Sequence, residues 1–264
     1  MRGFGRLLKK DLESIKQMAI IQGIGIILWD MFFYSRIGRG PVEVAVAPTF
    51  VPFALVFFWL VMQAVQVYRH EWQIGGIYQT LTLPQPGWKI ALAKLTAVMI
   101  GFTANAILAT LGFWWVMQAA GGLQIMGAYG DAILHSMVAR AYFVKATIGF
   151  GLVYWCFGLH MAIIIQAGYN CMRLATRWRF LLGISYFTLL WLHNLCGAIG
   201  YRIFAWVPDI AVKIPQHVWN VQGSIDSMHT ARIFIDSGSL LGSALGLFLI
   251  FWLTGYLIQN VMEA

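Results

Sequence analysis

Six apolar stretches divide the chain, and each is long enough to cross a lipid bilayer as a helix. A membrane-spanning helix needs about 20 predominantly apolar residues, and runs such as "FALVFFWLVM" and "LLGSALGLFLIFWL" are apolar on every side. Strands of a membrane barrel would instead alternate apolar and polar residues over about ten positions. We therefore predict an all-α polytopic membrane domain. Its spans cover approximately 17–37, 46–68, 90–118, 141–168, 180–205 and 237–258.

The composition supports one membrane domain over residues 1–264. The chain is 60% hydrophobic and 11% charged, which is more apolar surface than one soluble core of this size would hide. Its partner is therefore the lipid bilayer. Two of the three cysteines, Cys156 and Cys196, lie in predicted spans and Cys171 lies in a short basic loop, so we expect all three reduced. The net charge of +8 is interpreted as membrane topology, and no basic segment interleaved with aromatics indicates nucleic acid.

Charge distribution predicts that both termini are cytoplasmic. The loop "YNCMRLATRWR" holds three arginines and no acid, as cytoplasmic loops do. Residues 1–16 carry five cations, with Phe4, Leu7, Leu8, Leu12 and Ile15 on the opposite side. This pattern fits an interfacial amphipathic helix, and an ordinary positively charged flank of the first span is the alternative.

Two further regions have a predicted structural role. Residues 206–236 are polar and contain Pro208 and Pro215, so we expect an outer segment, with a short helix near 215–222, that folds back and caps the bundle. In the last span, Gly238, Gly242 and Gly246 recur every fourth residue. Such spacing lets two helix backbones approach closely, which predicts packing against a partner helix in this chain or in a second copy.

Polar residues within the spans are the candidates for a transport pathway. They are Gln63, Asn105, His160, His193 and Asn194. A haem held by His160 and His193 is an alternative, although an intramembrane histidine more often hydrogen-bonds across a helix interface. Asp30 and Lys94 are expected to lie near enough to a span end for their charges to reach water. No carboxylate deep in a span is expected, which disfavours ion coupling, and no metal site is predicted.

The polar segment 69–89 between the second and third spans contains the most specific pattern. "EWQIGGIYQTL" has apolar residues at helical spacing and reads as a short helix on the cytoplasmic surface. Pro84 then disfavours helical geometry at Leu83, and "QPGWK" turns the chain into the third span. Gly75 and Gly76 would each weaken a helix by about 1 kcal/mol, which suits a place where another backbone passes close by.

This pattern resembles the type-2 ABC exporter permease family, the transmembrane subunits of ABC transporters. The resemblance rests on a Glu after the second span, glycines a few residues later, a Leu-Pro pair and an early Lys in the third span. Here these are Glu71, Gly75, Gly76, Leu83, Pro84 and Lys94. The layout of an N-terminal amphipathic helix, six spans and a large outer segment is also similar.

The resemblance implies a transport subunit with no catalytic residues of its own. Segment 69–89 would be a coupling helix that docks onto a separate ABC ATPase through Glu71, Trp72, Gly75, Gly76, Tyr78, Leu83 and Pro84. ATP and Mg²⁺ would bind that ATPase, and no cofactor would bind this chain. A second permease chain, identical or not, would complete the path across the cytoplasmic membrane of a prokaryote. The expected cargo is amphipathic: a drug, a peptide antibiotic or a lipid.

Two other classes of protein remain as alternatives. One is a haem-binding membrane anchor of an electron-transfer complex, which would use His160 and His193. The other is an ion-coupled secondary transporter, which would work without ATP.

Overall fold

The computed structural model describes residues 2–39, 47–74, 85–120, 137–174, 181–216 and 229–260. Long helices dominate this part of the chain. They are α1 (Arg2–Tyr34), α3 (Val51–Ile74), α5 (Gly87–Ala119), α8 (Met137–Leu174), α9 (Leu181–Ile203) and α10 (Ser237–Asn260). A short 3-10 helix, η1 (Ala47–Phe50), leads directly into α3.

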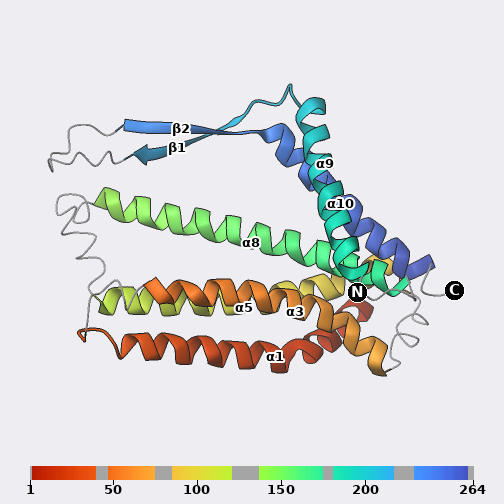
Figure 1. The fold of residues 1–264 in the computed structure, drawn as a ribbon, viewed down its shortest axis with the longest axis horizontal. Helices are drawn as coiled ribbons and strands as arrows, with labels where there is room; N and C mark the ends of the chain where they lie inside the picture. Colours follow the sequence, from red (N-terminus) through yellow and green to blue (C-terminus); the bar gives the residue numbers. More distant parts are fainter. Residues whose placement is uncertain are drawn as a thin grey trace.

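Figure 1 shows α1, α3, α5 and α8 running lengthwise beside one another, with α9 and α10 packed together and inclined to them. Helix α5 contacts α1, α3, α8 and α10, and α8 contacts α3, α5, α9 and α10, so these two helices connect the rest of the bundle. The N-terminus and the C-terminus lie at the same end of the molecule, and α3 and α8 end, and α5 and α9 begin, at that end too.

The helices identify a multi-pass membrane protein. Five of those described, α1, α3, α5, α8 and α10, are long and apolar enough to cross a membrane by length and composition. Large apolar side chains such as Phe58, Val153, Phe187, Trp191 and Phe248 are exposed on them and on α9, a distribution that is costly in water and favourable in lipid. Helix α9, which corresponds to the predicted span 180–205, falls outside this group of five; it contains the polar pair His193 and Asn194.

The predicted interfacial segment 1–16 and the predicted first span form one continuous helix, α1. No proline interrupts residues 2–34, so nothing in the backbone requires a break. The predicted apolar face exists, but it packs inside the protein: Leu7 and Ile15 are buried, and Phe4, Leu8 and Leu12 pack against the core.

The outer segment contains a β-hairpin, which the all-α prediction missed. Strands β1 (Ile210–Gln216) and β2 (His229–Ile235) pair antiparallel, with Ile210 opposite Ile235 and Gln216 opposite His229. The predicted helix 215–222 begins inside β1, and its remaining residues lie outside the described ranges. β-branched residues at Ile210, Val212 and Ile214 favour a strand, and Pro215 is tolerated because both strands of a ribbon are edge strands.

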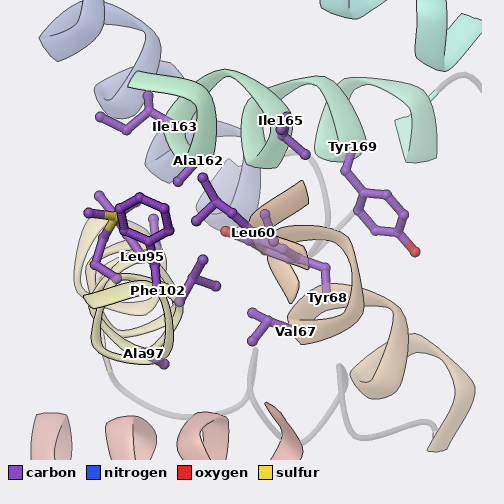
Figure 2. Close-up of a cluster of buried hydrophobic side chains, with 14 of the residues drawn as sticks. Leu60, Val67, Tyr68, Leu95, Ala97, Phe102, Ala162, Ile163, Ile165 and Tyr169 are labelled. Atoms are coloured by element: carbon purple, nitrogen blue, oxygen red, sulfur yellow. The ribbon is translucent and has the colours of Figure 1, made fainter. Parts of the chain in front are cut away.

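The core lies between α3, α5 and α8. Figure 2 shows Tyr169 of α8 on the side of Tyr68 of α3, and Phe102 of α5 beneath α8. The Tyr68 and Tyr169 ring centroids are 6.1 Å apart. A β-carbon added at Gly158 of α8 would lie 2.6 Å from the Phe102 ring, so that glycine lets the two helices close over the aromatic side chain.

Helices α9 and α10 meet through glycines. A β-carbon at Gly242 would lie 2.6 Å from the Gly200 Cα, and one at Gly246 would lie 2.9 Å from the Cys196 Cβ. A β-carbon at Gly238 would lie 3.2 Å from the Gly200 carbonyl oxygen. The structure therefore places all three glycines of the last span against α9 of the same chain, with the two backbones nearly touching.

We predict that Gly242→Leu lowers the thermal unfolding temperature of the detergent-purified chain, because the new side chain would overlap the α9 backbone. Overpacking of this kind costs about 1–3 kcal/mol. Gly149→Leu on α8 is the matched control, since nothing lies within 4 Å of a β-carbon there. Equal unfolding temperatures for the two variants would contradict the α9–α10 packing.

Candidate functional site

A buried ion cluster joins α1, α3 and α5 near the end of the bundle that carries both termini. The Lys94 ammonium on α5 lies 2.8 Å from a Glu71 carboxylate oxygen on α3 and 3.1 Å from one of Asp11 on α1. Lys94 is 1% exposed, and Asp11 and Glu71 are each 3% exposed. Three groups from distant parts of the sequence thus share one water-poor site.

Two further residues in the described part of the chain belong to the cluster. The half-exposed Lys10 lies 2.9 Å from the other Glu71 oxygen, so two ammonium groups balance two carboxylates. The Lys94 ammonium also lies 5.1 Å from the Tyr68 ring centroid on α3, where the face of the ring attracts a cation. Counted over the described residues, the cluster is electrically neutral, which limits the large desolvation penalty of a buried set of charges.

Helical spacing explains how each element supplies its residues. Asp11 lies four residues after Leu7 and four before Ile15, in the middle of the apolar face of α1. Tyr68 and Glu71 are three apart and therefore share one face of α3. An acid in the middle of an apolar face was the signal that sequence reasoning missed. Lys94 was expected to reach water from a span end, and the structure instead buries and pairs it.

The predicted docking residues fall into two groups. Glu71 and Trp72 lie in the last turn of α3, while Gly75, Gly76, Tyr78, Leu83 and Pro84 lie outside the described residues. Glu71 was predicted to anchor the chain at or near a docking surface. In the structure its carboxylate is committed to Lys94 and Lys10 within this chain.

A second polar contact lies further along the same pair of helices. The Asn105 side-chain amide on α5 donates to the Gln22 side-chain oxygen on α1 over 2.9 Å, and also to the Gly101 carbonyl over 3.2 Å. Like the Asp11–Lys94 pair, Gln22 and Asn105 are 83 positions apart in the sequence. Helices α1 and α5 therefore run parallel in one fixed register. Eleven residues separate the two contacts, which is about 16 Å along a helix.

The structure separates the predicted pathway residues into two places. Gln63 and Asn105 are both buried beside Gly101, where a β-carbon would lie 3.0 Å from the Gln63 side-chain oxygen. His160 of α8 and His193 of α9 meet elsewhere, with ring centroids 4.3 Å apart and nearly perpendicular. Asn194 faces outward from α9. These five residues do not line one continuous route.

The geometry of the two histidines differs from that of a bis-histidine haem site. A ligating imidazole nitrogen lies about 2 Å from its metal, so imidazoles on opposite faces of one iron have ring centres roughly 6 Å apart. The observed 4.3 Å leaves no room for a porphyrin between the rings. The contact has instead the edge-to-face form of two packed aromatic side chains.

Comparison with known proteins identifies no relative: no protein-family model, no curated protein and no solved structure matches the chain. The chemistry of the described residues is therefore the basis for a functional proposal. The ion cluster provides a rigid, neutral link between three helices.

We predict that Lys94→Met lowers the free energy of unfolding by about 3–5 kcal/mol, because it removes the buried cation that pairs with both the Asp11 and the Glu71 carboxylate. The measurement is denaturant unfolding in detergent micelles. Adding Asp11→Asn and Glu71→Gln to Lys94→Met is expected to recover most of the loss. The control is Lys89→Met, whose ammonium lies over the neighbouring Trp88 ring. A loss no larger than that of the control would show that the cluster does not hold the helices together.

Proposed function

We propose that this chain is the transmembrane subunit of an ATP-driven exporter of the type-2 ABC permease kind. The observation that carries the proposal is the position of the buried ion cluster. Glu71 lies at the end of α3 and Lys94 lies near the start of α5, so the cluster joins the two helices that flank the proposed docking segment 69–89. Asp11 extends the same link to α1.

A docked helix can transmit force only if the helices attached to it move with it. A neutral, buried ion cluster resists separation, because pulling one member away leaves the others as uncompensated charges. Movement of the docking segment by a partner ATPase would therefore displace α1, α3 and α5 together. Such rigid-body rocking of packed helices is a common form of switching between two states. ATP and Mg²⁺ belong to the ATPase in this proposal, and this chain performs no chemistry.

The proposed topology has six spans, because it adds α9 to the five helices that are long and apolar enough to cross a membrane. Both termini, the end of α3 and the start of α5 lie at one end of the bundle, and these parts of α1, α3 and α5 carry Lys10, Arg69 and Lys89. We assign it to the cytoplasm on the rule that positive charge accumulates there. The exposed aromatic side chains suit an amphipathic cargo, such as a drug, a peptide antibiotic or a lipid, and a second permease chain would complete the path.

The first test is association with an ATPase. We expect the affinity-tagged chain, isolated from its native membranes, to retain a nucleotide-binding-cassette ATPase that mass spectrometry identifies. Gly76→Trp, in the proposed docking segment, is expected to abolish this association. Gly149→Trp on the exposed face of α8 adds the same bulk and is expected to preserve it. Glu71 is unsuitable for this test, because its substitution would disturb the buried cluster. Equal retention by both variants would remove the docking role from segment 69–89.

A second function, ion-coupled transport, is favoured by a different observation. Three carboxylates, Asp11, Asp30 and Glu71, are buried in helices long and apolar enough to cross a membrane, whereas the sequence predicted none deep in a span. Buried acids in such helices commonly belong to proton or ion pathways. The cluster pairs two of them with lysines, which suits a structural link better than a mobile proton.

The energy source separates the two functions. In inside-out vesicles containing the chain and its ATPase, we expect a fluorescent amphipathic dye to accumulate on addition of ATP, and a protonophore to leave the rate unchanged. Accumulation driven by an imposed proton gradient without ATP would favour the ion-coupled transporter.

A further inference from the structure

Asp30 is a buried acid that the ion cluster does not include. It lies on α1 and is 3% exposed, and its Oδ1 atom has no hydrogen-bond partner. Its other carboxylate oxygen lies against Gly112 of α5, at the position that a β-carbon of residue 112 would occupy. The absence of a side chain at Gly112 thus creates the notch that holds this carboxyl group.

The surroundings of Asp30 offer no compensating charge among the described residues. The facing part of α5, residues 104–119, contains no titratable side chain, and neither do η1 and the first half of α3. On α1 itself, the Tyr34 ring stacks on Trp115 at 4.3 Å, and the nearest cation after it, Arg36, lies over the Phe32 ring at 5.1 Å. The neighbouring Trp29 donates its indole N–H to the Pro48 carbonyl. Asp30 differs in this respect from Asp11 on the same helix, whose carboxylate pairs with the Lys94 ammonium.

An isolated carboxylate is very unfavourable in such an apolar, enclosed place, and the group avoids the penalty by binding a proton. The neutral acid needs no cation. We propose that Asp30 is a proton-binding site, whose carboxyl group is held as the neutral acid in the notch at Gly112. This inference is independent of the proposed exporter function, because proton binding at Asp30 requires neither an ATPase nor turnover.

Proton binding at Asp30 makes the α1–α5 contact sensitive to pH. The acid is neutral while the helices are packed, and it ionises when their separation admits water. Opening of this contact therefore releases a proton, and a rise in pH favours the open arrangement. A protein that alternates between two helix arrangements would release and rebind a proton at this position.

The experiment is infrared spectroscopy of the full chain in lipid nanodiscs at neutral pH. We expect a protonated-carboxyl C=O band that Asp30→Asn removes. The control is Asp209→Asn, which alters an exposed carboxylate and is expected to leave the band unchanged. Gly112→Ala fills the notch and is expected to remove the band although Asp30 is present. Gly25→Ala is the matched control, because Gly25 lies on the same helix as Asp30 and a β-carbon there would have nothing within 4 Å. It is expected to retain the band.

If the Asp30→Asn variant folds, the protonated-carboxyl band tests the proposal directly. A spectrum with no protonated-carboxyl band, or a band that persists in Asp30→Asn, would overturn it, and an ionised Asp30 that holds a metal cation would give the first of these results. Where that variant misfolds, an apolar carbodiimide on the unaltered chain decides instead, because this reagent modifies protonated carboxyls in apolar surroundings. An adduct on Asp30, with Asp11 and Glu71 unmodified, is expected. Unmodified Asp30 would then overturn the proposal.

Discussion

The pairing of Lys94 with Asp11 and Glu71 is the constraint on which the arrangement of the bundle depends. A lysine at 1% exposure within a membrane-spanning helix is tolerated only if counter-charges reach it. Those counter-charges come from α1 and α3, so both helices must converge on α5 at this depth. The half-exposed Lys10 supplies the second positive charge, at the solvent-facing side of Glu71. A local electrostatic requirement thus fixes the relative positions of three helices that are far apart in the sequence.

Three polar features lie along the contact between α1 and α5, and each has a different chemistry. The first is the ion pair of Asp11 and Lys94, the second is the amide pair of Gln22 and Asn105, and the third is the single acid Asp30 against Gly112. In the first two, a side chain of α1 pairs directly with a side chain of α5, and these pairs hold the helices together. In the third, the Asp30 carboxyl group has no cation beside it among the described residues, and a bound proton removes its charge. One end of the contact is thus held by paired charges, and the other end is the place where water would change the protonation state.

The sequence predicted the helices well and the polar contacts poorly, and the reason is physical. The length of an apolar run determines whether a helix can cross a bilayer, so the predicted spans lie within the six long helices for most of their length. The position of a charge depends on partners that sequence periodicity does not reveal. Lys94 was assigned to a span end because its two carboxylate partners are 23 and 83 residues away.

Local patterns explain the remaining differences. The hairpin of β1 and β2 was missed because both strands are only seven residues long and β1 contains Pro215, which is typical of a loop. The interfacial helix was predicted because the apolar face of residues 4–15 suits lipid and protein equally. The contacts of Gly112 with Asp30 and of Gly242 with Gly200 depend on helix register in three dimensions, which a single sequence does not encode in readable form.

The common offset of 83 positions between α1 and α5 restricts how this chain can vary in length. Eleven residues make just over three helical turns, so both contacts face nearly the same way. One inserted residue between Asp11 and Gln22 would turn everything beyond it by about 100° and carry Gln22 away from Asn105. Length changes are therefore confined to the connections outside these stretches, unless both helices lengthen by the same number of residues at the same level.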